Sequence, residues 1–159
     1  MMKNLWVLFA LLWSFNSSAS IDKTVYFAAF SSNDLVKIKA ERIRIEKMST
    51  SSEKKAYLGA ILMKESQFLS SAKEKLAQFN KGKVLLEAEI TANQSVVEYR
   101  FLRLMIQENC PKILKYTSKI QEDSRIVAKE FAKQTGSVKS IILTYSKSSP
   151  ALPTSKLTS

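Results

Sequence analysis

The sequence contains no histidine among its 159 residues. Histidine is the commonest general base of enzymes and a frequent zinc ligand, so its absence excludes the usual catalytic triads, cysteine–histidine catalysis and most zinc sites. The three glycines lie too far apart to form a phosphate-binding loop, and neither a P-loop nor a G-x-G-x-x-G motif occurs. We therefore expect no catalytic residue, no metal and no cofactor.

Cysteine occurs once, at Cys110, directly before Pro111 and at the end of an apolar segment. A single cysteine cannot form an internal disulfide. It is either buried and inert, as cysteine often is, or available for a bond to another molecule. Its position favours the buried and inert alternative.

Long apolar runs are absent except at the start of the chain. Lys3 precedes nine apolar residues, Leu5 to Trp13, which are followed by a short polar stretch ending in small residues. This order is typical of a secretory signal peptide. A spanning helix needs ~20 apolar residues. We expect a signal peptide at 1–19, cleaved after Ala19 or Ser20, no stable membrane insertion afterwards, and a periplasmic or extracellular protein.

Positive charge exceeds negative charge, with 25 Lys and Arg against 14 Asp and Glu and a formal net charge of +11. Such a protein attracts anionic surfaces. However, the lysines are spread along the chain without a block of five or more, and export argues against nucleic acid as a partner. The basic segment from Leu35 to Met48 resembles a membrane-surface helix. An ordinary amphipathic helix that covers the core explains its pattern better.

Helical spacing of apolar residues recurs through the rest of the chain, and convincing strand alternation is missing. Patterns of the capping-box form precede many of these segments, beginning at Ser31, Thr50, Ser71, Ser95 and Ser118. The spacing predicts helices at 22–30, 33–47, 51–68, 72–92, 96–109, 119–134 and 138–146. We expect one all-α domain at 20–147, and a disordered tail at 148–159 because that segment is rich in Ser, Thr and Pro.

The segment 96–109 has two apolar sides with a narrow polar stripe of Arg100, Arg103 and Gln107 between them. Two apolar sides predict a helix packed between neighbours at the centre of the domain. Two guanidinium groups and an amide on one ridge could hold a carboxylate, phosphate or sulfate. Alternatively, the stripe is a solvated edge, or Arg103 pairs with Glu108 or with a carboxylate of a neighbouring helix. Carboxylates one or two positions apart, Glu122/Asp123 and Glu87/Glu89, do not face each other on a helix and are expected to be solvated.

The segment Glu98 to Tyr116, EYRFLRLMIQENCPKILKY, resembles a signature of a family of exported bacterial proteins of unknown function, found mainly in Bacteroidetes. The resemblance extends to Lys55–Lys64 (KAYLGAILMK) and Phe79–Asn93 (FNKGKVLLEAEITAN), and weakly to about Lys147. That family also resembles a divergent tetratricopeptide repeat, with Gly82 at a position for a small residue. The resemblance implies an exported protein of helical hairpins, and it supplies no activity and no site residues.

These observations lead to an all-α fold of about seven short helices, packed as antiparallel, tetratricopeptide-like hairpins. We expect a non-catalytic binding or scaffold protein in which a groove between hairpins holds a peptide or another envelope protein. The alternative is an anion-binding protein that holds an acidic ligand, a glycan or a lipid head group through Arg100 and Arg103. A hydrolase with a serine–lysine pair stays open, although no spacing singles out a pair.

Overall fold

The computed structural model describes residues 20–134 and 136–157, so the predicted signal peptide at 1–19 lies outside it. The described residues form seven α-helices, three short 3₁₀ helices and no strand. The helices are α1 (Lys23–Ser31), α2 (Leu35–Glu46), α3 (Ser52–Ser66), α4 (Ala72–Ala92), α5 (Val97–Asn109), α6 (Ile120–Glu130) and α7 (Gly136–Ser146). The prediction of an all-α protein with about seven helices is confirmed.

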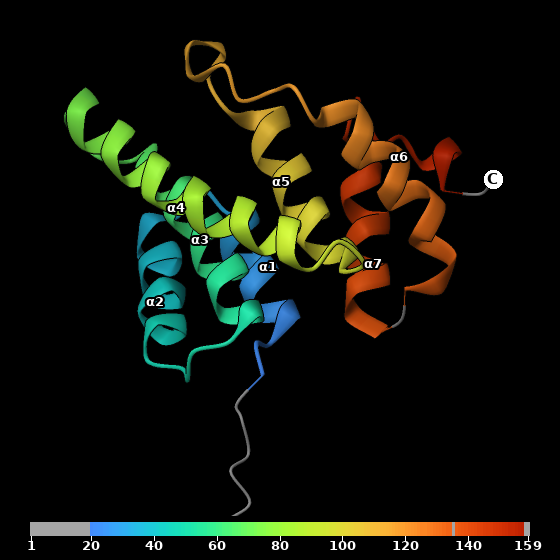
Figure 1. Cartoon of the computed structure of the whole chain (residues 1–159), viewed down its shortest axis with the longest axis horizontal. Coiled ribbons are helices and arrows are strands. Elements are labelled where there is room, and N and C mark those ends of the chain that lie inside the picture. The colour runs from blue at the N-terminus through green and yellow to red at the C-terminus, as the bar shows by residue number, and fades with distance from the viewer. Residues whose placement is uncertain (1–19, 135, 158–159) are drawn as a thin grey trace, which may run out of the picture.

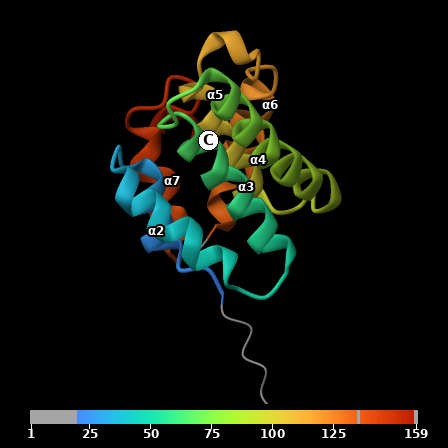
Figure 2. The same cartoon turned by 90° about the vertical axis from the view of Figure 1, so that its left-hand side faces the viewer.

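Successive helices pack against one another around α3 and α5 (Figures 1 and 2). Helix α3 contacts α2, α4 and α5, while α1 contacts α2 and α7, and α5 contacts α4 and α6. Helices α3 and α4 run antiparallel: Lys55 near the start of α3 pairs with Glu89 near the end of α4, and Gln78 donates to the Leu62 carbonyl. This pair is a helical hairpin of the expected kind.

Side-chain caps begin the first four helices, though mostly not at the expected residues. Ser71 Oγ accepts from the Glu74 amide at 3.1 Å, as its capping pattern predicts. At α2 and α3 the cap is Asp34 and Ser51, inside or beside the predicted motif. Helices α5 and α6 start without a side-chain cap, so the patterns at Ser95 and Ser118 were wrong. Several neighbouring polar residues can fit the spacing of a capping motif. Only the residue whose side-chain oxygen reaches the free amides of the first turn acts as the cap.

Two glycines allow α3 and α4 to approach at backbone distance. A Cβ placed on Gly59 would lie 2.7 Å from the Gly82 carbonyl oxygen and 2.8 Å from the Leu86 amide nitrogen. A Cβ on Gly82 would collide in turn with the Gly59 carbonyl oxygen. Both positions therefore require glycine for steric reasons, and the crossing fixes the distance between the two helices.

Helix α5 lies in the core, as its two apolar sides predict. Phe101, Leu102 and Leu104 are fully buried. The ring of Phe27 in α1 lies 5.7 Å from that of Phe101, and Tyr26 packs edge-on against Tyr57 of α3 at 4.6 Å. These contacts connect α1, α3 and α5 in one continuous hydrophobic core.

Helix α2 covers the core from one side. Ile38 and Ile45 are fully buried beneath it, whereas Val36 is exposed. The core-covering alternative for this basic segment is the one that the packing supports. In the part of the chain that the structure describes, no helix is both long and apolar enough to cross a membrane.

The C-terminal segment is packed, so the prediction of a disordered tail from residue 148 is wrong for residues 148–157. Leu152 and Leu157 are buried. The Glu108 carboxylate accepts from the Ser149 hydroxyl at 2.7 Å and from the Ala151 amide at 2.8 Å. The single domain therefore extends beyond 147 to 157, and residues 158–159 lie outside the described residues. Composition did not predict the order of this segment, because the order depends on two buried leucines and on the distant, half-buried acceptor Glu108.

Candidate functional site

Arg103, the centre of the predicted stripe, is enclosed by two carboxylates. Its Nε and Nη2 donate to the two oxygens of Asp123 at 2.7 and 2.8 Å, and its Nη1 donates to Glu87 at 2.6 Å. Arg103 is 4% exposed and Asp123 is 0% exposed. The pair is therefore an internal, bidentate ion pair between α5 and α6, with Glu87 supplied by α4.

Arg100 belongs to the same cluster. Its Nη1 donates to Glu122 at 3.0 Å and to Asp123 at 3.2 Å. The Tyr116 hydroxyl donates to the second oxygen of Glu87. Every acid in the cluster except Glu122 is thus engaged by more than one buried donor. The expectation that Glu87, Glu89, Glu122 and Asp123 are solvated was wrong for Glu89 and Asp123, which are both buried, because it considered only their spacing on their own helices.

Gln107 does not extend an accessible ridge. Its side chain is 2% exposed, and neither its Nε2 nor its Oε1 has a hydrogen-bond partner among the described residues. Of the two partners proposed for Arg103, the neighbouring helix supplies the carboxylate, and Glu108 instead anchors the C-terminal segment. An external anion that bound this stripe would have to compete with carboxylates that the protein itself supplies, Glu87 and Asp123 at Arg103 and Glu122 and Asp123 at Arg100.

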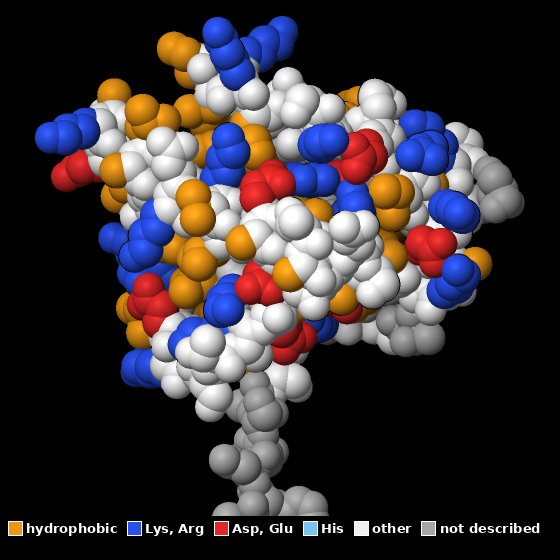
Figure 3. All heavy atoms as spheres, viewed as in Figure 1, with side chains coloured by type: hydrophobic (Ala, Val, Ile, Leu, Met, Phe, Trp, Pro, Cys, Tyr) orange, Lys and Arg blue, Asp and Glu red, His pale blue; other side chains and the backbone are white. Residues whose placement is uncertain are grey.

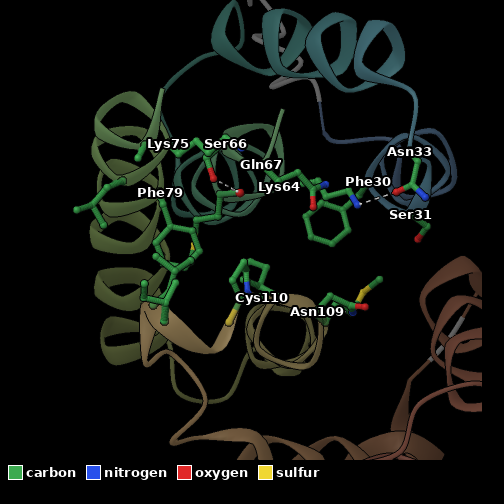
Figure 4. Close-up of a pocket in the computed structure, with 18 of the residues that line it drawn as sticks. Phe30, Ser31, Asn33, Lys64, Ser66, Gln67, Lys75, Phe79, Asn109 and Cys110 are labelled. Carbon is green, nitrogen blue, oxygen red and sulfur yellow. Dashed lines mark hydrogen bonds between the residues drawn. The ribbon is translucent and has the colours of Figure 1, made fainter. Parts of the chain in front are cut away.

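A groove lies elsewhere, between the ends of α1, α3, α5 and α7, the start of α4 and the turn after α5 (Figure 4). Its volume is about 580 Å³. The lining residues are Phe30, Ser31, Asn33, Met63, Lys64, Ser66, Gln67, Ala72, Lys75, Leu76, Phe79, Met105, Ile106, Asn109, Cys110, Pro111, Ile113, Leu114, Tyr145 and Ser148. Apolar side chains gather on the surface between the start of α4 and the loop after α5 (Figure 3).

The groove has an apolar floor and an exposed apolar rim. Phe30 and Phe79 stand on opposite sides of it, with Asn109 and Cys110 of the α5 end between them (Figure 4). Both phenylalanines are nearly fully buried, whereas Ile113 on the rim is 86% exposed. Exposed apolar side chains around a concave apolar surface are typical of a binding site rather than of ordinary surface.

Positive charge in the groove has no acidic partner. Lys64 and Lys75 are its charged lining residues, and neither forms an ion pair with a described residue. The Lys64 ammonium donates at 3.5 Å to the side-chain oxygen of Asn33, a long contact. Burial lowers the pKa of Lys64 from its ordinary value. The groove therefore contains a half-buried cation without a counter-charge.

No family model, curated protein or solved structure matches this chain. The resemblance of Glu98–Tyr116 to an exported family stays a prediction. The site must therefore be interpreted from its own chemistry. Sequence reasoning expected a groove between hairpins but did not identify its residues, because five separate segments form it. The only local signal is the apolar run that ends in Lys64, within KAYLGAILMK.

Cys110 lies at one wall of the groove and is half-buried. Its sulfur donates to the carbonyl oxygens of Gln107 and Tyr116, at 3.6 and 3.5 Å. Burial raises the pKa of the Cys110 thiol, so it is protonated and weakly nucleophilic at neutral pH. This environment favours the inert alternative for Cys110.

The structure brings one serine and one lysine together outside the groove. Lys156 Nζ lies 3.4 Å from Ser124 Oγ, but Ser124 is fully buried and its hydroxyl donates to the Ala151 carbonyl. Lys156 donates to the same carbonyl at 2.7 Å. The serine proton is thus directed away from the lysine, and the pair ties the C-terminal segment to α6. Within the described residues, no group of three acidic or cysteine side chains is placed to bind a metal ion.

Proposed function

We propose that this chain is an exported, non-catalytic binding protein whose ligand site is the groove between α1, α3, α4 and α5. The observation that carries the proposal is a concave apolar surface of about 580 Å³ whose charged lining residues are both lysines. Small-molecule sites have volumes of ~300–1,000 Å³ and combine an apolar lining with a few polar groups. The groove fits that description.

The titratable groups of the groove support binding rather than chemistry. The groove has no carboxylate, and its thiol and its phenol, Cys110 and Tyr145, are both in surroundings that raise the pKa. Burial is the main cause in each case, and for Tyr145 the hydrogen bond to Glu108 adds to it. Neither group is ionised at neutral pH, so the groove offers no general base near its lysines.

The groove also changes where an anionic partner is expected. The sequence suggested either a peptide between hairpins or an anion on Arg100 and Arg103. The arginines have carboxylate partners within the protein, while Lys64 has none among the described residues. The groove combines the apolar surface of the first idea with the unpaired positive charge of the second.

A neutral apolar fluorophore, 1-N-phenylnaphthylamine, tests the proposal. We expect the mature protein to bind it at one equivalent with an increase in fluorescence. Ala72 is exposed at the start of α4 and lines the groove, so Ala72→Trp fills the groove without burying new groups in the core. Ala77 is exposed on the same helix and does not line the groove, which makes Ala77→Trp the matched control.

Ala72→Trp should abolish binding and Ala77→Trp should retain it, with both variants folded by circular dichroism. Equal binding by the two variants would place the fluorophore elsewhere and overturn the proposal. An unmodified protein that does not bind the fluorophore would also overturn it. Export is tested separately, by sequencing the N-terminus of protein recovered from the cell envelope, where we expect cleavage after Ala19 or Ser20.

A further inference from the structure

We propose that the ligand of the groove is a single-chain amphiphile with one anionic head group, such as a fatty acid, whose head group pairs with Lys64 while its chain lies between Phe30 and Phe79. This inference rests on the proposed function and adds the chemical class of the ligand. It follows from the charge of the groove and from the polarity of its floor.

Charge is the first argument. Two lysines and no acid line the groove. Lys23 is another half-buried lysine and pairs with Glu53 and Glu98, whereas the half-buried Lys64 has no acidic partner among the described residues. A half-buried ammonium is poorly solvated, and an anion placed beside it restores the lost interaction. Lys75 is exposed at the other side, so it adds long-range attraction rather than a second buried contact. A neutral or cationic head group would leave Lys64 unpaired.

The floor is the second argument. Phe30, Met63, Phe79 and Met105 are each at least nine-tenths buried and present no hydrogen-bonding group to the groove. Peptide amide and carbonyl groups that faced these four side chains would have no hydrogen-bond partners there, at a cost for each group. A hydrocarbon chain has no such groups. Two methionines also provide a surface that adapts to a flexible chain. These properties favour a single alkyl chain over a peptide.

Geometry places the two parts of the ligand together. Lys64 extends from the last turn of α3 toward Asn33 at the α1 end, above the ring of Phe30 (Figure 4). A head group beside Lys64 therefore sits at the edge of the apolar floor, and the chain continues across it toward Phe79 on α4. The Asn33 side chain lies within reach of the same head group.

Isothermal titration calorimetry with three twelve-carbon probes tests the inference: dodecanoate, monododecyl phosphate and neutral dodecanol, all below their aggregation limits. We expect one equivalent of dodecanoate or dodecyl phosphate to bind about tenfold or more tightly than dodecanol, as expected for one charge-assisted contact. Lys64→Gln should remove this preference and leave dodecanol binding unchanged. Lys64→Arg should retain it, since the charge is kept. Lys73→Gln, on α4 but outside the groove, is the matched control and should also retain it.

Equal affinity for dodecanoate and dodecanol in the unmodified protein would overturn the inference. A preference that survives Lys64→Gln would overturn the role of Lys64. In either case, unchanged binding of 1-N-phenylnaphthylamine would show that the groove is still a ligand site, so the two proposals fail separately. Tighter binding of dodecanoate identifies a free fatty acid as the source of the head group, and tighter binding of dodecyl phosphate identifies a phosphorylated lipid; both support an anionic amphiphile.

Discussion

Replacing Arg103 with methionine removes the centre of the buried ion-pair cluster while keeping an unbranched side chain of similar length. Three hydrogen bonds are lost, two to Asp123 and one to Glu87. Asp123, which is fully buried, then keeps only Arg100 Nη1 at 3.2 Å as a cationic partner. The variant therefore leaves the buried Asp123 carboxylate without two of its three side-chain hydrogen bonds from arginine.

Breaking a buried ion pair by removing one partner costs ~3–5 kcal/mol, because the remaining charge is uncompensated. Arg100 stays in place, so we expect a loss at the lower end, about 3 kcal/mol. Domains of this kind have a total stability of ~5–15 kcal/mol. The Arg103→Met protein should thus be folded at 25 °C but with a clearly lower urea midpoint.

Equilibrium unfolding in urea, followed by circular dichroism at 222 nm, measures this loss. Arg125 is exposed on α6, and Arg125→Met should change the free energy of unfolding by less than about 0.5 kcal/mol. In a double-mutant cycle, Arg103→Met combined with Asp123→Asn should cost about 1–3 kcal/mol less than the sum of the two single changes. A loss below about 1 kcal/mol for Arg103→Met would refute the reasoning. If that variant stayed stable and also lost dodecanoate binding, the anion site would be the arginine stripe and not the groove.

Three further changes test other parts of the structure. Gly82→Ala should lower the free energy of unfolding by about 2 kcal/mol, because the new Cβ collides with the Gly59 backbone. This overpacking outweighs the gain in helix propensity. An increased melting temperature would contradict the close approach of α3 and α4. Burial and the hydrogen bond to Glu108 raise the pKa of Tyr145 above its ordinary value, so the folded state favours the neutral phenol, and stability that is present below pH ~10 is lost as the pH rises further. Urea unfolding from pH 8 to 11 should show this decline, and Tyr145→Phe should make it shallower; an unchanged slope would exclude Tyr145 as a contributor. Gln107→Leu should be neutral or stabilising by up to about 1 kcal/mol, because the buried amide has no partner among the described residues, and a loss of more than about 1 kcal/mol in the same urea assay would show that the amide has an essential partner.

The helices could be predicted from sequence because apolar periodicity is local information. Every α-helix of the structure begins and ends within four residues of its predicted bounds. The central position of α5 followed from its two apolar sides. These features depend on residues within one or two turns of each other, which a single sequence displays directly.

The features that could not be predicted depend on residues far apart in the chain. Asp123 is buried because Arg103, twenty positions earlier, reaches it from another helix. The C-terminal segment is ordered because Glu108 accepts from Ala151, forty-three positions later. The groove is formed by five separate segments of the chain. Composition and spacing carry no information on such pairings, so they missed the acid of the ion pair, the packed tail and Lys64.

The contact between Glu108 and residues 149–151 has a consequence for the order in which the chain folds during synthesis. A single domain generally folds as a unit. A nascent chain that has emerged only to residue 147 lacks two donors to Glu108, the Ser149 hydroxyl and the Ala151 amide, and the buried side chains of Leu152 and Leu157. The surroundings of α5 and α6 are therefore completed last, and the chain stays incompletely folded until nearly all of its described residues have been made.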